Sequence, residues 1–311
     1  MIPFLHIGPL TIPTFGLMVA TALLVSGYIL QADLNRRANT MPARSKQGKF
    51  AEPSTHQDDG FLIVTIAGIA GLVGARLYHV LETPREFFAN PWPMLFTRYG
   101  FAWFGGFLGG FLALIILARR FKTPVLEFFD ICAPAAAVGY AIGRIGCLLS
   151  GDGDYGRPTL LPWGMAFPNG VVPTTDTCVQ QGWPESCRVH PTPIYEFFIW
   201  LAIAAFLWYL GGKALRNSKL GDKVGGQLGG QLVGRIGDKV GDKLNGLIFC
   251  GYLILTGIAR FMVEFLRINP RSFYGLTNAQ AASIVSVLLG ALLLWRILRL
   301  ATRHSSLATS S

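Results

Sequence analysis

Long apolar segments recur along this chain and alternate with polar stretches that carry most of the charged residues. Each apolar segment is about 20 residues long, which is the length an α-helix needs to cross roughly 30 Å of hydrocarbon. The pattern therefore predicts an all-α, polytopic membrane protein with seven transmembrane helices in a single domain, 1–311. The predicted spans lie near 12–31, 60–81, 99–118, 124–149, 191–212, 246–266 and 279–298.

The composition and the charge pattern add an orientation to this prediction. Hydrophobic residues make up 51% of the 311 residues and charged residues only 14%, more apolar mass than one soluble core of this length needs. Of the 27 Lys and Arg residues, 18 fall on one set of loops and 6 on the alternate set. Because cytoplasmic loops carry the excess of positive charge, we expect the N-terminus outside and the C-terminus in the cytoplasm. The net charge of +10 suits anionic lipid headgroups and gives no argument for nucleic acid.

Two polar segments are long enough to have roles of their own. Residues 150–190 are rich in Pro, Gly and Trp and form a predicted external loop or lid. Cys178 and Cys187 lie in this loop, where we expect a disulfide, whereas no spacing of Cys and His in the chain predicts a metal site. Residues 213–245 repeat the sequence GDK and are a predicted flexible cytoplasmic insert, because so much glycine disfavours a stable helix.

One arginine stands inside an apolar run. Arg144 belongs to the stretch GRIGCLLSGDGDYG, residues 143–156, which ends in small and acidic residues. An arginine in hydrocarbon is costly and needs an anionic partner. That partner is either a carboxylate of the protein, which burial alone favours, or the phosphate of a lipid.

Two further groups of polar residues lie at the predicted outer ends of spans. They belong to VHPTPIYE and RFMVEFLR and comprise His190, Tyr195, Glu196, Arg260, Glu264 and Arg267. Arg260 and Glu264 are four positions apart, so they share one face of a helix and are expected to pair, with Arg267 continuing the same stripe. Two guanidinium groups in lipid, Arg144 and Arg260, suit a phosphodiester.

Glycine pairs at a four-residue spacing mark the third predicted span, in FGGFLGGF at residues 104–111. Such a face lets another helix approach closely. The bare backbone at Gly105 and Gly106 equally leaves room for a lipid or peptide chain. The pattern does not separate these two interpretations.

Three motifs together resemble those of a known family. GRIGCLLSGDGDYG, VHPTPIYE and GIARFMVEFLR are similar in order and separation to the motifs of bacterial prolipoprotein diacylglyceryl transferases, and the resemblance covers nearly the whole chain. It implies transfer of the diacylglyceryl group of phosphatidylglycerol to the thiol of the lipobox cysteine in a prolipoprotein signal peptide, forming a thioether and releasing glycerol phosphate. It further implies a bacterial inner-membrane enzyme among membrane lipids, with its active site toward the periplasmic leaflet. We expect a monomer that needs no metal or other cofactor.

The resemblance also implies roles for individual residues. Arg144 would bind the lipid phosphate, and Arg260 would bind or stabilise the departing glycerol phosphate, where charge accumulates as the carbon–oxygen bond breaks. Glu264 would hold Arg260 in place, and Asp152 is the further candidate for catalysis. The residues expected to support the site are Tyr155, His190, Tyr195, Glu196, Arg267, Gly105 and Gly106.

The chain departs from the family pattern at several polar positions, with Asp152 in place of a glutamate and Phe15 in place of a tyrosine among them. The histidine that many members carry before the first glycine pair is Phe104, which cannot accept a proton, and the asparagine of the arginine motif is Cys147. Either the histidine is not obligatory for the chemistry, or another group accepts the thiol proton, for which the candidates are Asp152, His190 and His79. Asp152 follows the Arg144 segment closely, and positioning that arginine suits it equally well.

Two other functions stay open from the sequence. The departures at Phe104 and Cys147 also fit a diverged paralogue that binds lipid or lipoprotein without transfer, or with altered transferase activity. A transporter of small anions would require broken helices related by an internal repeat, and we find no such repeat in the sequence.

Overall fold

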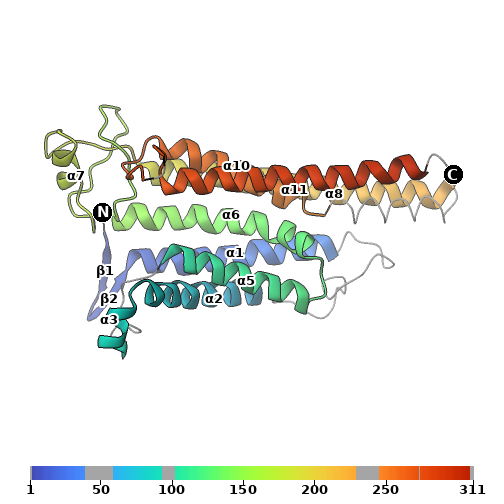
Figure 1. Ribbon diagram of the computed structural model, residues 1–311, viewed down its shortest axis with the longest axis horizontal. Helices are drawn as coiled ribbons and strands as arrows, with labels where there is room; N and C mark the ends of the chain where they lie inside the picture. Colours follow the sequence, from blue (N-terminus) through green and yellow to red (C-terminus); the bar gives the residue numbers. More distant parts are fainter. Residues whose placement is uncertain (1, 39–58, 93–101, 229–244, 273, 309–311) are drawn as a thin grey trace. The chain divides into compact units, whose positions relative to one another are not determined.

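The computed structural model describes residues 2–38, 59–92, 102–228, 245–272 and 274–308, most of them helical (Figure 1). The helices are α1 Thr14–Ala38, α2 Asp59–Glu82, α3 Pro84–Ala89, α5 Trp103–Arg120, α6 Val125–Ser150, α7 Thr174–Gln180, α8 Thr192–Leu228, α10 Leu247–Glu264 and α11 Asn278–Ala308. Strands β1 Phe4–Ile7 and β2 Leu10–Pro13 pair as an antiparallel hairpin directly before α1. The sequence pattern did not predict this hairpin.

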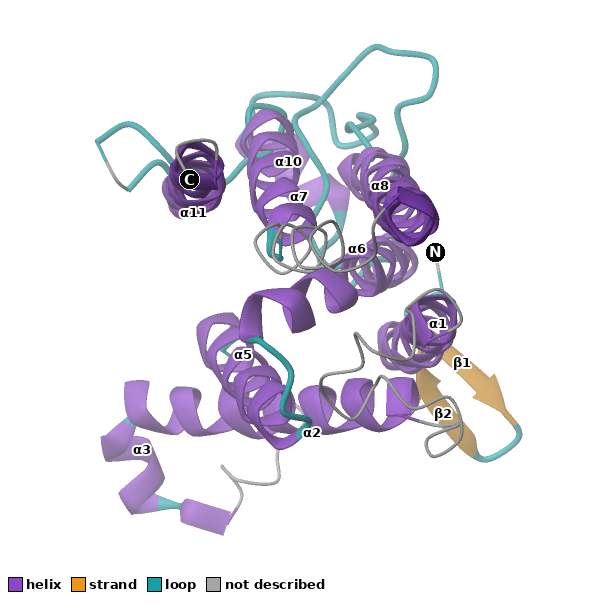
Figure 2. Ribbon diagram, turned by 90° about the vertical axis from the view of Figure 1, so that its right-hand side faces the viewer, coloured by secondary structure: helices purple, strands orange, loops and turns teal. Residues whose placement is uncertain are grey.

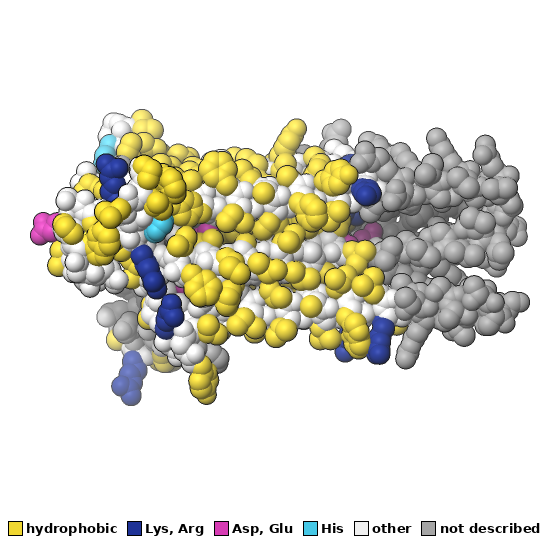
Figure 3. Space-filling view, turned by 90° about the horizontal axis from the view of Figure 1, so that it is seen from above, with side chains coloured by type: hydrophobic (Ala, Val, Ile, Leu, Met, Phe, Trp, Pro, Cys, Tyr) yellow, Lys and Arg dark blue, Asp and Glu magenta, His cyan; other side chains and the backbone are white. Residues whose placement is uncertain are grey.

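Six of the described helices are long and apolar enough to cross a membrane, which confirms the prediction of an all-α polytopic membrane protein. They are Thr14–Ala38, Asp59–Glu82, Val125–Ser150, Thr192–Lys213, Leu247–Glu264 and Asn278–Leu300. Hydrophobic side chains cover the sides of the helices, as Figure 3 shows. Helix α5 occupies most of the predicted segment 99–118 and is not among the six, so the seventh span and the orientation of the termini stay predictions.

The chain divides into two compact units, one formed by Ser26–Phe129 and the other by Met1–Val25 together with Asp130–Ser311. The single domain 1–311 stays a prediction. In the unit Ser26–Phe129, helices α2 and α5 lie side by side (Figures 1 and 2). A Cβ atom added to Gly105 would run into the backbone carbonyl of Gly74 and the Cβ of Tyr78. The structure therefore confirms that the glycine pattern serves close packing of two helices at Gly105, where α5 meets α2.

In the second unit, α6 packs against α8 and α10 through small side chains. Ala133, Ala137 and Ala141 recur every four residues on α6, and all three are buried. Their short side chains let Trp200 and Leu207 of α8 approach closely. Because α6 and α10 run antiparallel to α8, the ends of α6 and α10 meet the start of α8 (Figure 1).

The start of α10 is fixed by a buried carboxylate on α6. Asp130 accepts hydrogen bonds from the backbone N–H groups of Gly246, at 2.6 Å, and Phe249, at 2.7 Å. These N–H groups have no partner within their own helix, so the carboxylate stabilises the helix end. This contact sets the position of α10 along α6.

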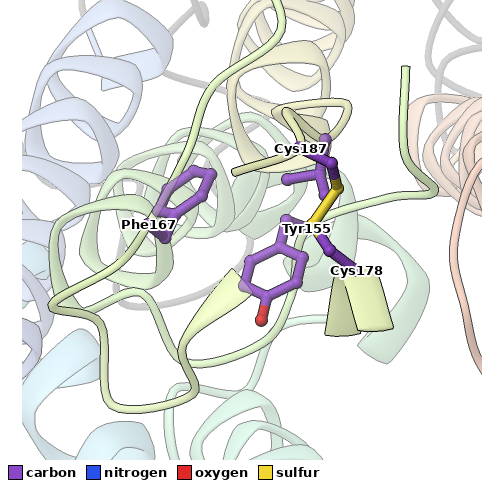
Figure 4. Close-up of a cluster of buried hydrophobic side chains, with 5 residues drawn as sticks. Tyr155, Phe167, Cys178 and Cys187 are labelled. Carbon is purple, nitrogen blue, oxygen red and sulfur yellow. A yellow bond between two sulfur atoms is a disulfide. The ribbon is translucent and has the colours of Figure 1, made fainter. Parts of the chain in front are cut away.

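The predicted loop 150–190 has a hydrophobic core of its own (Figure 4). The predicted disulfide between Cys178 and Cys187 is confirmed, and it packs with Phe167 and Tyr155, whose rings stack with centroids 5.2 Å apart. The Tyr155 hydroxyl donates to the Val172 carbonyl at 2.9 Å. The loop is therefore an ordered module, while its external location and its use as a lid stay predictions.

The predicted insert 213–245 begins as a helix, because α8 continues to Leu228. Glycine disfavours a new helix, but extending an existing helix costs far less than starting one. Residues 229–244 of the insert lie outside the described part of the chain.

Candidate active site

Three helix ends and the loop after α6 bring their charged residues to one place in the second unit. Three arginines and three carboxylates form a single ion-pair cluster: Arg144, Arg260, Arg267, Asp154, Glu196 and Glu264. Positive and negative groups are equal in number, so the six charges compensate one another. Such compensation is what allows them to be buried among apolar helices.

Glu196, in the first turns of α8, lies at the centre of the cluster. Its carboxylate is 3.1 Å from Arg260 Nη1, 3.4 Å from Arg144 Nη1 and 3.7 Å from Arg267 Nη1. The Tyr140 hydroxyl, one turn before Arg144, donates to the same carboxylate at 3.2 Å. With 1% of its side chain exposed, Glu196 is an anion that the three arginines share.

The predicted pair on α10 is confirmed. Arg260 Nη2 lies 2.9 Å from the carboxylate of Glu264, one helical turn later. Glu264 is buried and also accepts a hydrogen bond from the Asn269 side chain at 2.5 Å. Its carboxylate therefore holds Arg260 from one side while Glu196 holds it from the other.

Of the two partners that the sequence left open for Arg144, the structure shows carboxylates, those of Glu196 and Asp154. Asp154 also pairs with Arg267, so it links the end of α6 to the end of α10. The sequence suggested Asp152 as the carboxylate that positions Arg144, and the structure assigns this contact to Asp154 instead. The reason is the turn between them, since Gly151 and Gly153 have φ of 60° and 92°, a conformation that favours glycine.

The two aspartates of this turn have different surroundings. Burial alone would raise the pKa of Asp154, but Arg267 and Arg144 outweigh burial and lower its pKa to about 2. Burial and the neighbouring Asp154 carboxylate raise the pKa of Asp152. Asp152 accepts a hydrogen bond from the backbone N–H of Asp154 at 3.2 Å, and its carboxylate lies within 4.8 Å of Cys147 Sγ.

The exposure of the three arginines separates them into two kinds. Arg144 has 17% of its side chain exposed and Arg260 has 22%, whereas Arg267 has only 5%. The cluster is therefore more open to its surroundings at Arg144 and Arg260 than at Arg267. Two N–H groups of Arg267 are buried without a hydrogen-bond partner among the described residues, which leaves part of its hydrogen-bonding capacity unused.

Comparison with known proteins identifies the family to which this apolar helical chain with its cluster of charges belongs. Residues 3–296 match the family model described as prolipoprotein diacylglyceryl transferase. The chain belongs to this family. It is therefore a membrane-embedded transferase, and the resemblance carried by its three motifs is confirmed.

Curated relatives of this transferase come from distant bacteria. The chain is similar to the phosphatidylglycerol–prolipoprotein diacylglyceryl transferase of Clostridium tetani, with 26% identity over 89% of both chains. The protein of the same name from Synechococcus elongatus is 30% identical over 93% of this chain and 85% of its own. The one from Bifidobacterium longum is 29% identical over 91% of this chain and 80% of its own.

The other predicted residues of the transferase lie around the cluster or in the other unit. Tyr195 accepts a hydrogen bond from Trp163 Nε1 at 2.8 Å, and its hydroxyl lies 3.3 Å from His190 Nδ1. Burial lowers the pKa of His190. The Tyr155 ring lies in the loop core (Figure 4), and its hydroxyl donates to the carbonyls of Val172 and Pro173 within the loop.

Phe104 and the glycine pair belong to the unit Ser26–Phe129. The Phe104 side chain is 52% exposed, and its ring centroid lies 6.4 Å from that of Tyr78. Gly105 packs against α2, whereas a Cβ atom on Gly106 would make only an ordinary contact, 3.5 Å from the Cβ of Ala75. Within this unit Gly105 therefore has a packing role that Gly106 does not share.

By spacing alone, Cys147, Asp152 and Asp154 are close enough to hold a cation, with ligand atoms within 4.8 Å of one another. The charge of Asp154 is already compensated by two arginines, which repel a cation. We therefore assign no metal to these residues of the transferase.

Sequence reasoning missed Asp154 and Tyr140. The tandem GDGD of residues 151–154 was a signal for Asp154, because it offers two carboxylates on one turn. The position of Tyr140, four residues before Arg144 on α6, was the signal for a contact between them, and the Arg144 guanidinium lies 4.6 Å from the centre of the Tyr140 ring.

Proposed function

We propose that this protein transfers the diacylglyceryl group of phosphatidylglycerol to the lipobox cysteine of prolipoproteins, forming a thioether and releasing glycerol phosphate. The reaction class follows from the family and from the names of the relatives, which indicate a role in lipoprotein maturation. The observation that carries the proposal is the cluster itself, in which two partly exposed guanidinium groups lie at the end of apolar helices.

The arginines supply what this reaction needs. Breaking the bond between the glycerol carbon and the phosphate oxygen leaves charge on the phosphate, and fixed cations are an effective way to stabilise it. Arg144 binds the phosphate of the lipid, and Arg260 stabilises the departing glycerol phosphate. Glu264 holds Arg260 in place through the 2.9 Å pair, so the cation needs no rearrangement during the reaction.

The remaining residues keep the two arginines in position. Arg267 is nearly inaccessible and pairs with Asp154, and Glu196 joins all three arginines. Tyr155 supports Asp154 from the core of the loop, to which it belongs. His190 and Tyr195 connect the loop to the start of α8.

The site faces the periplasmic leaflet of the bacterial inner membrane in this proposal. The loop 150–190, which borders the cluster, carries 2 Lys or Arg residues, as expected for an external segment, whereas 213–245 carries 7. The partners are phosphatidylglycerol and a prolipoprotein signal peptide, both of which arrive through the membrane. The protein acts as a monomer among membrane lipids, and its arginines supply the electrostatic stabilisation.

The test is transfer from labelled phosphatidylglycerol to a synthetic lipobox peptide by the purified protein, with a peptide that carries serine in place of cysteine as control. We expect transfer that depends on the thiol. Arg144→Ala and Arg260→Ala should each reduce it by roughly 10²-fold or more, while Arg157→Ala, an exposed arginine of the loop, should leave it unchanged. Full activity in both cluster variants would contradict the role given to the arginines.

One observation supports a second candidate function. Phe104 replaces a polar residue of the family pattern with an exposed apolar ring, which fits a diverged member that binds lipid or lipoprotein without transfer. Folded protein that binds phosphatidylglycerol vesicles but transfers nothing to the thiol peptide would favour this second function.

A further inference from the structure

The proposed transfer requires the lipobox thiol to lose a proton, and no histidine stands in this chain where many family members carry one. A thiol with a pKa of about 8.5 is only a few per cent ionised at pH 7. Phe104 offers only carbon and hydrogen atoms at that position. Another group must therefore accept the proton in this protein.

His190 is poorly suited to this role. Its Nδ1 atom lies 3.3 Å from the Tyr195 hydroxyl, and its backbone N–H and carbonyl pair with Arg157 and Gly156. These contacts fix it as a link between the loop and α8. Of the charged side chains at the ion-pair cluster, the carboxylates are therefore the better candidates.

Within the cluster, Asp154, Glu196 and Glu264 are each engaged by at least two arginines. A carboxylate whose oxygens face guanidinium groups in this way is poorly placed to accept a proton from a substrate. Asp152 differs, because its carboxylate accepts a hydrogen bond from the backbone N–H of Asp154 and lies within 4.8 Å of Cys147 Sγ. It is half-buried, so a substrate group can reach it.

A carboxylate oxygen of Asp152 lies within 4.8 Å of Cys147 Sγ, so the site has room for a thiol sulfur beside this carboxylate. The two aspartates also differ in basicity in the way that two carboxylates of one active site commonly do, one permanently ionised and one able to take up a proton. Burial and the charge of Asp154 raise the pKa of Asp152, while the arginines lower that of Asp154.

We propose that Asp152 accepts the proton of the lipobox cysteine, while Asp154 remains an anion that positions Arg144 and Arg267. This assignment rests on the proposed function and names the group that performs its proton transfer. An Asp152 carboxylate oxygen takes the thiol proton, and the sulfur forms its bond to the glycerol carbon that carries the phosphate. The bond from that carbon to the phosphate oxygen breaks, and its electron pair leaves with glycerol phosphate. The proton then passes from Asp152 to the departing phosphate, which restores the carboxylate.

The charged and titratable groups that face Asp152 are Asp154, Arg144, Cys147 and Tyr155. Asp154 and burial favour the protonated form of Asp152, and Arg144 favours the ionised form. Since the net effect raises the pKa of Asp152, transfer by the unmodified protein should fall as the pH becomes mildly acidic and the carboxylate is protonated.

The experiment compares kcat/KM for the lipobox peptide between pH 6 and 10 in the unmodified protein and in Asp152→Asn. We expect the variant to lose about 10²-fold at pH 7, because a positioned base contributes roughly 10²–10⁴-fold. In the variant, the thiol loses its proton to solvent. Its remaining activity should therefore follow the ionised fraction of the peptide thiol and rise about tenfold per pH unit up to about pH 8.5. Asp152→Glu should keep the pH profile of the unmodified protein.

Two further variants make the pH profile decisive. Asp154→Asn should lose activity equally at every pH, because it disturbs the arginines, and Asp176→Asn, on an exposed residue of α7, should change nothing. A loss in Asp152→Asn that is the same at every pH, or no loss at all, would overturn the assignment of Asp152 while leaving the proposed function intact. Absence of transfer by the unmodified protein would instead overturn the proposed function.

Discussion

Removing the disulfide between Cys178 and Cys187 is expected to loosen the loop that carries Asp154. Both cysteines are buried in one cluster with Phe167 and Tyr155, the residue next to Asp154 (Figure 4). The double variant Cys178→Ser/Cys187→Ser keeps the side-chain size and removes the covalent link. The closed loop then has to be maintained by side-chain packing and hydrogen bonds alone.

The size of the effect follows from the length of the ring that the disulfide closes. The two cysteines are nine positions apart, and closing a ring of about ten residues removes chain entropy worth roughly 2.6 kcal/mol at 25 °C. Since every 1.4 kcal/mol is a factor of ten in an equilibrium constant, the open form of the loop should become about 70-fold more populated.

Limited trypsin digestion measures this population. Arg188 is exposed beside the loop core, and its backbone carbonyl is held there by a hydrogen bond from the backbone N–H of Thr159. At low protease concentration cleavage follows the population of the open form, so the double variant should be cut about 70-fold faster after Arg188.

The control is Cys250→Ala, which removes a buried free cysteine of α10 and should leave cleavage in the loop unchanged. An unchanged cleavage rate in the double variant would refute the reasoning, because it would show that the loop core holds Tyr155 and its neighbours without the covalent link.

Three further substitutions test the charges and the packing of the helices by denaturation in detergent. Glu264→Gln removes a buried partner of Arg260 and should cost up to about 3 kcal/mol of unfolding free energy, since Arg260 keeps some exposure to solvent. Gly105→Ala should cost about 1–3 kcal/mol, because the added methyl group would meet the carbonyl of Gly74. Asp130→Ala should cost about 2 kcal/mol or more, because two N–H groups at the start of α10 lose a charged acceptor.

Matched variants accompany the first two of these substitutions. Glu185→Gln, in an exposed part of the loop, and Gly106→Ala, where a methyl group finds ordinary contacts at 3.5 Å, should each change stability by less than about 0.5 kcal/mol. Equal losses in Gly105→Ala and Gly106→Ala would contradict the close contact assigned to Gly105 alone.

Much of the helical architecture could be predicted because the forces that decide it are local. A run of about 20 apolar residues forms a helix in a membrane whatever its neighbours are, since its backbone can satisfy its hydrogen bonds only internally. The pairing of Arg260 with Glu264 was predictable for the same reason, because four residues make one helical turn. The hairpin of β1 and β2 was missed because its apolar residues merge with the start of the first predicted span.

The sequence by itself determined six of the predicted membrane-spanning helices and the motifs of the family. Only the tertiary structure decided which carboxylate meets which arginine. Asp152 and Asp154 are the same residue type two positions apart, so their sequence neighbourhood cannot tell them apart. Their different surroundings come from the glycine turn after α6 and from Arg267, which lies 113 positions from Asp154 along the chain and pairs with it because α6 and α10 end side by side.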